Sequence, residues 1–399
     1  MRLEKSLFRG SLILLVAFGL FNVLNFFFQF AMARMLSVAE YGVLAALFSI
    51  FYILLVFTES IQTIITKYSV KENEPGKLKN LIKKSLSKGL FWAIVLFILN
   101  LLISIPLSYL LDIEYVLLAV NGLVIFLVFF SPITRGVLQG RKKFGSLGVN
   151  MAIESSSKLA LGIFLVFIGF GVMGAIAGNI LAGVLAFAFS LFPLKKVLRS
   201  KELKNSTEGI YDYARPAFVI TLVIIVFYSI DVVLAKMVFS AETAGSYAIA
   251  SILAKIIFWG TAPISKAMFP LSAESGSNRK NIFVNALLIL FLIILFSSIF
   301  LYYFPEFIIK IFAGQFISAS SSVLFYIGLA MGLISIANLV LLYKLSIGKV
   351  KGYPYLFVLL AIEIISMVYF SDTLLSFSIA FVVASLVFLI GSIFLLRKK

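Results

Sequence analysis

The chain has 399 residues, of which 62% are apolar and 13% are charged, and its mean hydropathy is +1.12. A soluble domain of this length could not bury so much apolar surface, so the composition excludes the soluble classes and predicts an integral membrane protein. Cys and His are both absent, which excludes disulfides, thiolate catalysis and His-based metal sites or proton relays. We therefore expect no metal and no cofactor, and any ion-coupled step must use carboxylates or lysines.

Twelve apolar runs follow one another along the chain. Each is about long enough to cross a ~30 Å hydrocarbon layer as a helix with a rise of about 1.5 Å per residue. The sequence therefore predicts an all-α integral membrane protein with twelve transmembrane helices. The first run is roughly twice as long as the apolar core of a signal peptide, so we expect a membrane helix there and not a cleaved leader. The runs cover residues 11–33, 41–64, 89–111, 115–134, 148–170, 172–193, 216–238, 243–264, 282–304, 319–343, 353–370 and 373–396.

The positive charges are distributed unevenly over the gaps between these runs. With the N-terminus placed in the cytoplasm, 27 of the 34 Lys and Arg residues fall on that side, whereas the opposite gaps hold only Arg34, Lys236 and Lys310. This asymmetry follows the positive-inside rule, which predicts that both termini are cytoplasmic in a plasma or inner membrane. It also accounts for the net charge of +17, and no basic segment is interleaved with aromatics that could stack bases, so we expect no nucleic-acid partner.

A short motif occurs twice. Ala33-Arg34-Met35 followed by Ala39-Glu40-Tyr41-Gly42 returns 202 residues later as Ala235-Lys236-Met237 followed by Ala241-Glu242-Thr243-Ala244-Gly245, with one extra residue before the glycine. Each copy lies in the outer gap after the first helix of a set of six. Because six is even, both sets enter the membrane from the same side, which predicts a parallel repeat of two six-helix bundles, 1–204 and 205–399, joined by the basic segment 195–214.

Four short motifs follow one another in order along the whole chain. They are Arg34-x-Leu36 with Glu40-Tyr41-Gly42, Leu138-Gln139-Gly140 before a basic turn, Asp231 before Lys236 with Glu242-x-x-Gly245-x-Tyr247-x-x-Ala250, and Phe304-Pro305 leading to Phe312-x-Gly314. Together they resemble the polysaccharide flippases, the O-antigen and teichoic-acid exporters of the multidrug/oligosaccharidyl-lipid/polysaccharide (MOP) exporter superfamily. The chain departs from the family pattern at Ser37 and Phe239, where the family often has glycine.

The resemblance implies a function and its partners. It implies two six-helix bundles that move a lipid-linked oligosaccharide, on a polyprenyl phosphate or pyrophosphate carrier, from the cytoplasmic to the outer leaflet by alternating access. Membrane lipids, and glycosyltransferases or the polymerase of the same pathway, are the further partners expected. No enzymatic activity is implied.

Six charged residues fall inside the predicted membrane helices, where each costs about 2.5–3.5 kcal/mol to insert and rarely faces lipid. Glu154 and Lys158 are four residues apart, so their side chains can meet on one helix face, either as a structural ion pair or as part of a gate. The carboxylates are expected to act in ion coupling or gating. The six are Glu59, Glu154, Lys158, Asp231, Lys255 and Glu363.

Basic and polar residues supply the candidate substrate contacts. A lipid phosphate or pyrophosphate needs cations, and Lys255, Lys158, Arg34 and Lys236 are the candidates. Arg34 and Lys236 lie near the outer helix ends, so they could instead reach the headgroups. The first helix also carries a polar stripe with i, i+3, i+7 spacing, which could line a sugar path or form hydrogen bonds between helices. The stripe consists of Asn22, Asn25 and Gln29.

Two rival functions remain open. A cation-coupled multidrug exporter of the same superfamily should gather carboxylates without competing lysines, and a membrane glycosyltransferase or polymerase should bring a large outer loop, whereas the longest outer gap is 305–318. No GxxxxGK[ST] phosphate-binding loop is found, so energy must come from the membrane potential or from an ion gradient. Protonation of Asp231, Glu363 or Glu59 could provide that coupling.

Overall fold

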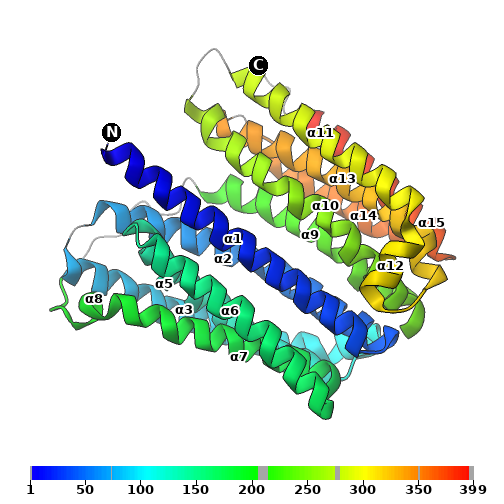
Figure 1. The fold of residues 1–399 in the computed structure, drawn as a ribbon, viewed down its shortest axis with the longest axis horizontal. Helices are drawn as coiled ribbons and strands as arrows, with labels where there is room; N and C mark the ends of the chain where they lie inside the picture. Colours follow the sequence, from blue (N-terminus) through cyan, green and yellow to red (C-terminus); the bar gives the residue numbers. More distant parts are fainter. Residues whose placement is uncertain (1, 73, 205–213, 275–278, 349–350, 395–399) are drawn as a thin grey trace. The chain divides into compact units, whose positions relative to one another are not determined.

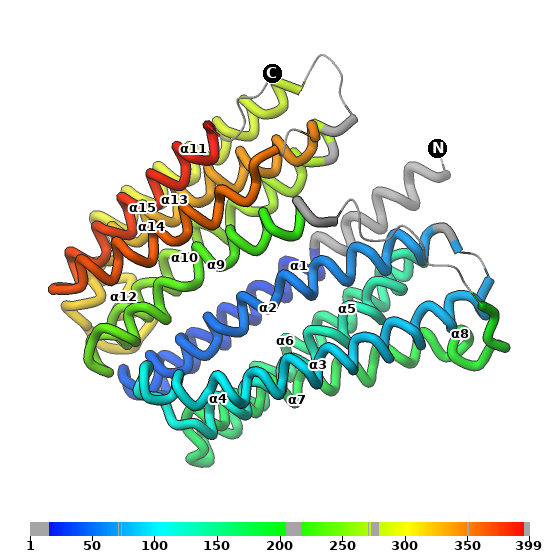
Figure 2. Tube along the Cα trace, turned by 180° about the vertical axis from the view of Figure 1, so that it is seen from behind, coloured from blue at the N-terminus to red at the C-terminus, as the bar shows by residue number. Residues whose placement is uncertain are grey.

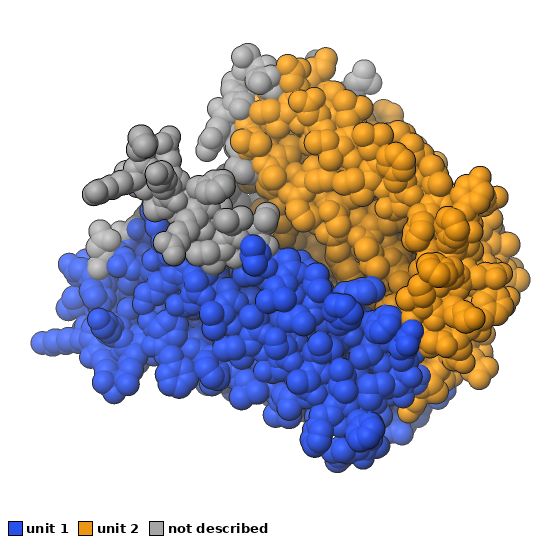
Figure 3. Space-filling model, in the orientation of Figure 1, with its two compact units in different colours: residues 1–36, 54–210 blue, residues 37–53, 211–399 orange. Residues whose placement is uncertain are grey.

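The protein was analysed as a computed structural model that describes residues 2–72, 74–204, 214–274, 279–348 and 351–394 (Figure 1). In these ranges the chain is almost entirely helical and contains no strand. Contacts divide it into two compact units, Met1–Leu36 with Leu54–Ile210 and Ser37–Ile53 with Tyr211–Lys399 (Figure 3). The first half of the second helix thus packs with the C-terminal unit, and the single boundary at 204/205 stays a prediction.

The helices follow the predicted order. The first unit contains α1 (Arg2–Met35), part of α2 (Val38–Lys71), α3 (Pro75–Leu111), α4 (Tyr115–Asn121), α5 (Val124–Gly140), α6 (Phe144–Leu165), α7 (Gly171–Leu191) and α8 (Lys195–Arg199). The second contains α9 (Ala214–Val238), α10 (Ala241–Glu274), α11 (Arg279–Tyr303), α12 (Pro305–Ala313), α13 (Ser318–Ser346), α14 (Leu356–Tyr369) and α15 (Leu374–Phe394).

The twelve predicted membrane helices are all present in the described ranges. In the described ranges ten segments are long and apolar enough to span a membrane, and one of them, Phe144–Arg199, contains two long helices, α6 and α7. The chain leaves helical geometry between these two at Gly169 (φ 98°) and Gly171 (φ 50°), backbone angles that favour glycine. The shorter apolar segment Tyr353–Tyr369 is the twelfth. The chain is therefore an all-α, multi-pass membrane protein.

Several helices are longer than the apolar runs predicted. α3 has 37 residues, which corresponds to about 55 Å and exceeds the ~30 Å hydrocarbon layer. Its first turns, from Pro75, are rich in Lys and were predicted to be loop. Hydropathy detects only the part of a helix that lies in hydrocarbon, so these polar turns and the short helices α8 and α12 were missed.

The same neighbours recur in the two units. In the first unit α1 packs on α6, α6 on α7, α5 on α7 and α3 on α5. In the second unit α9 packs on α14, α14 on α15, α13 on α15 and α11 on α13. Numbered by membrane crossing, these are the same four pairs in each unit, and the ribbon of Figure 1 and the tube of Figure 2 show the helices concerned. The sequence repeat is therefore also a repeat of packing.

A serine begins the second helix of each repeat. Ser37 and Glu40 form a capping box before α2, because the Glu40 N–H donates to Ser37 Oγ at 3.3 Å and the Ser37 N–H donates to Glu40 Oε2 at 2.9 Å. At the start of α10, the Thr243 N–H donates to Ser240 Oγ at 3.4 Å. Ser37 stands where the family often has glycine. Its hydroxyl thus accepts a hydrogen bond from the Glu40 N–H, which glycine, with no side chain, could not accept.

The two repeated glycines meet in the C-terminal unit. A Cβ on Gly42 of α2 would lie 2.8 Å from the Cα of Gly245 in α10, and a Cβ on Gly245 would lie 1.9 Å from the backbone oxygen of Val38. Only glycine allows the two backbones to approach this closely. The motif that revealed the repeat therefore also holds α2 and α10 together.

Glu202 and Leu203, in the segment that joins the two repeats, are hydrogen-bonded to α3. The Leu203 N–H donates to the Gly76 carbonyl at 3.2 Å, and the Glu202 carboxylate accepts hydrogen bonds from Asn80 at 2.6 Å and from Lys83 at 3.0 Å. The bond from Lys83, followed by that from Asn80, lowers the pKa of Glu202 below its ordinary value. The segment up to residue 203 is thus part of the first unit.

The predicted topology can be tested with single cysteines in this Cys-free chain. The positive-inside rule places residues 67–88 and 195–214 in the cytoplasm, since they hold 12 of the 34 basic residues. Cysteines at Lys77 and Lys201 should resist a membrane-impermeant thiol reagent in intact cells, whereas one at Ser240, exposed between α9 and α10, should react. Labelling of Lys77 or Lys201 from outside would contradict the orientation.

The close approach of α2 and α10 gives a stability prediction. Gly245→Ala should lower the melting temperature of the purified protein, because overpacking costs typically 1–3 kcal/mol and outweighs the roughly 1 kcal/mol that alanine gains in helix propensity. Gly260→Ala in the same helix is the matched control, since its Cβ would meet nothing within 4 Å. Equal melting temperatures for the two variants would argue against the backbone contact.

Candidate functional site

The second unit encloses a buried ionic cluster between α9 and α10. Asp231 of α9 is fully buried, and its Oδ1 accepts a hydrogen bond from Lys255 Nζ at 2.8 Å. Its Oδ2 accepts from Ser251 Oγ at 2.5 Å and from the Tyr247 hydroxyl at 3.3 Å. The three donors are spaced i, i+4, i+8 on α10, so they share one face. Three donors, one of them a cation, stabilise Asp231 as an anion.

Glu363 of α14 belongs to the same cluster but is bonded differently. Its side chain is fully buried, and neither carboxylate oxygen has a hydrogen-bond partner. It interacts electrostatically with Asp231 and Lys255, and also with Tyr247. The cluster thus contains two carboxyl groups and one ammonium group. If all three were ionised, it would carry a net charge of −1.

Aromatic rings of α15 pack against residues of α9 and α10 beside this cluster. Phe377 packs against the ring of Tyr247 with centroids 5.1 Å apart, and Phe388 stacks on Phe227 of α9 at 4.2 Å. Phe377 and Phe388 are both fully buried. The polar groups of α9, α10 and α14 are therefore surrounded by apolar side chains, which strengthens the electrostatic interactions among them.

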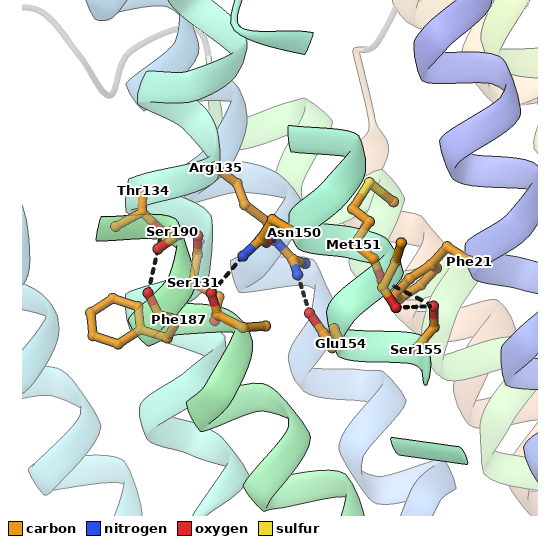
Figure 4. Close-up of polar contacts among 12 residues, drawn as sticks. Phe21, Ser131, Thr134, Arg135, Asn150, Met151, Glu154, Ser155, Phe187 and Ser190 are labelled. Atoms are coloured by element: carbon orange, nitrogen blue, oxygen red, sulfur yellow. Dashed lines mark hydrogen bonds and ion pairs between the residues drawn. The ribbon is translucent and has the colours of Figure 1, made fainter. Parts of the chain in front are cut away.

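The first unit contains a second polar cluster, on α5 and α6 (Figure 4). Arg135 of α5 forms an ion pair with Glu154 of α6 and donates through Nε to Asn150 Oδ1 at 2.8 Å. Asn150 Nδ2 donates in turn to the carbonyl of Ala186 in α7. The cluster therefore connects three helices.

Lys158 lies one turn beyond Glu154, on the side of α6 that packs on α1. Its Nζ donates to Asn25 Oδ1 at 3.0 Å and lies 4.6 Å from the centroid of the Phe28 ring. Its side chain is buried, and it interacts electrostatically with Glu154 across the i, i+4 spacing. Arg135, Lys158 and Glu154 together carry a net charge of +1.

The remaining predicted residues occupy different environments. Arg34 is exposed, with its guanidinium 4.5 Å over the Phe30 ring, whereas its repeat counterpart Lys236 is buried. Of the α1 stripe, Asn22 is exposed, Asn25 is half-buried and donates to the Phe21 carbonyl, and Gln29 is buried. Glu59 on α2 is exposed. The structure thus gathers Asp231, Lys255 and Glu363 in one place and Asn25, Glu154 and Lys158 in another.

Sequence reasoning missed several members of the two clusters. Arg135 was counted with a cytoplasmic loop, because the apolar run was ended at residue 134, whereas α5 continues to Gly140. The apolar residues Val137 and Leu138 after it were the available signal. Tyr247 and Ser251 were not assigned to the site, although they precede Lys255 by two turns and by one turn.

The profile of the family described as polysaccharide biosynthesis protein matches residues 31–321, which is more than half of the chain. The chain belongs to this family. This agrees with the resemblance drawn from the sequence motifs. A curated relative, an uncharacterized membrane protein of Methanocaldococcus jannaschii, is 24% identical over 328 residues, 75% of each chain.

Solved structures share the fold of this family member. An inward-facing multidrug resistance MATE family transporter of the MOP superfamily matches with a TM-score of 0.79 and 15% identity, covering 94% of this chain and 93% of that one. The lipid II flippase MurJ in an inward closed conformation matches with a TM-score of 0.72 and 16% identity. The match covers 96% of this chain and 87% of the flippase. The chain therefore has the fold of the MOP superfamily, which this multidrug transporter and this lipid II flippase share.

The Asp231–Lys255 pair makes a prediction about folding. Lys255→Met removes the cation but keeps most of the apolar volume, and removing one member of a buried pair costs about 3–5 kcal/mol. We expect the variant to fall in membrane abundance and melting temperature, and the double variant Lys255→Met with Asp231→Asn to recover much of both. Normal abundance of Lys255→Met alone would show that Asp231 does not depend on Lys255.

Proposed function

We propose that this membrane transporter is a flippase that moves a lipid-linked oligosaccharide from the cytoplasmic to the outer leaflet. The observation that carries the proposal is the net positive cluster of Arg135, Glu154 and Lys158 in the first unit, in a chain of the polysaccharide biosynthesis family. A polyprenyl phosphate or pyrophosphate brings negative charge into the membrane, and partly dehydrated cations compensate it.

Lys158 is the residue most suited to this role in the first unit. Its ammonium donates to the Asn25 amide oxygen at 3.0 Å and lies 4.6 Å from the centroid of the Phe28 ring, and these two contacts orient it. Lysine binds phosphate as a compact point charge. The neighbouring polar groups of α1, Asn25 and Gln29, offer both donors and acceptors to sugar hydroxyls.

The structure also modifies the role proposed for Lys255. Its ammonium is buried and bonded to Asp231, so its charge is already balanced within the C-terminal unit. We therefore propose that Lys255 belongs to the coupling and folding machinery, together with Asp231 and Glu363. Glu59, Arg34, Lys236 and Asn22 remain proposed contacts for gating, headgroups or substrate.

A multidrug exporter is the second candidate, because the MATE transporter shares this fold at a TM-score of 0.79. The charges argue against it. An organic cation near the cluster of Arg135, Glu154 and Lys158 would meet two cationic groups and one carboxylate, and like charges repel strongly in a low-dielectric site. Both candidates would lie in the cell membrane with cytoplasmic termini, and the flippase would work beside the glycosyltransferases or polymerase of its pathway.

The experiment uses purified protein in liposomes with a fluorescent polyprenyl-pyrophosphate sugar. Lys158→Met should lower the flipping rate roughly ten- to hundredfold at equal incorporation, because a hydrogen bond to a charged group contributes about 1.5–3 kcal/mol. Lys158→Arg should keep part of the rate, and Lys88→Met, which changes an exposed lysine of α3, is the control.

Two outcomes would contradict the proposal. Wild-type flipping by Lys158→Met would exclude this lysine from substrate binding. Efflux of an organic cation by the wild-type protein, without flipping of any lipid-linked sugar, would favour the multidrug exporter.

A further inference from the structure

Two carboxyl groups and one ammonium group are buried together in the C-terminal unit, and their hydrogen bonds are shared unequally. Asp231 accepts three hydrogen bonds, including one from Lys255, whereas both oxygens of Glu363 lack a partner. An ionised carboxylate without a partner is very costly in an apolar interior, so such a group takes up a proton instead.

Among the described residues, the charges that act on Glu363 are those of Asp231 and Lys255. Of the helices packed on α14, α15 has no titratable residue in its described range, and the side chains described in α9 include Tyr228, Asp231 and Lys236, of which Asp231, a like charge, interacts with Glu363. The short helix Tyr353–Tyr355 before α14 carries two phenols, Lys351 in the turn before it is exposed, and α10 supplies Tyr247 and Lys255, which is bonded to Asp231. Two carboxyl groups that share a site cannot both be ionised cheaply, and the one with fewer donors keeps the proton.

The same contacts argue against a free metal ion in this cluster. The ammonium of Lys255, 2.8 Å from Asp231, already occupies the position of a cation beside this carboxylate. Among the described residues, no group of three or more acidic residues could hold a metal. A further cation would have to approach this ammonium group closely, and like charges repel strongly in a buried site.

We infer that Glu363 is the proton-carrying residue of this transporter. The ammonium group of Lys255 is the cation with which either Asp231 or Glu363 can pair. In the conformer described here Glu363 is protonated and Lys255 pairs with Asp231. When the cluster opens to water, the O–H bond of Glu363 breaks, its proton leaves to solvent, and Lys255 stays protonated between two carboxylates. This inference rests on the proposed ion-coupled transport and names the ion as H⁺.

The test is infrared spectroscopy of the purified full-length protein. The wild type at neutral pH should show the C=O stretch of a protonated carboxylic acid, and Glu363→Gln, which mimics the neutral acid in shape, should lose it. Glu154→Gln, which removes a paired carboxylate from the other unit, is the matched control and should keep the band. Asp231→Asn should also lose the band, because Lys255 is then left with Glu363 as its partner.

A second measurement needs no variant. Replacing choline chloride by sodium chloride at fixed pH should leave the melting temperature of the wild type unchanged. Absence of the carboxylic acid band in the wild type, its persistence in Glu363→Gln, or stabilisation specific to Na⁺ would overturn the inference.

The outcomes also separate this inference from the proposed function. A protein that shows the band but flips no lipid-linked sugar would count against the flippase proposal and in favour of the proton site. Flipping by a protein without the band would support the flippase proposal and count against the proton site.

Discussion

A charge enclosed among membrane helices must be neutralised by a partner or by a proton, and this requirement organises both units. In the first unit Glu154 is neutralised by Arg135, and the amide of Asn25 and the ring of Phe28 hold Lys158. In the second unit Lys255 neutralises Asp231, and Glu363 is left over. The excess charge is positive in the first unit and negative in the second. This difference in charge underlies both the anionic substrate proposed for the first unit and the proton inferred for the second.

The hydropathy of the sequence predicted the fold class and every membrane crossing, because each crossing must be apolar over the whole hydrocarbon layer. It could not predict where the helices end. The first turns of α3 are rich in Lys and lie beyond the apolar run, yet they are helical, and Gly76, Asn80 and Lys83 in them hold the segment that ends at Leu203. Outside the hydrocarbon layer, such tertiary contacts decide the structure.

The candidate site was predictable only one residue at a time. Insertion cost alone singled out Asp231, Lys255 and Glu363, but their assembly depends on how α9, α10 and α14 pack, which no local pattern encodes. The Glu154–Lys158 spacing was correct as helix geometry, whereas the ion pair of Glu154 is with Arg135, a residue 19 positions earlier in the sequence. Arg135 was assigned to a loop for the same reason that α3 was shortened: its charge ended the apolar run.

The two repeats share the residues that shape the start of their second helices but differ in their buried charged residues. Both keep the serine that begins their second helix, and Gly42 and Gly245 form one shared contact. By contrast, at the offsets of 202 and 203 that align these motifs, Asp231 corresponds to Gln29 and Lys255 to Tyr52. Two units with equal packing and equal charge would bind the same ligand twice. Because the charges differ while the packing recurs, the proposed flippase would bind its anionic substrate in one unit and the inferred proton in the other.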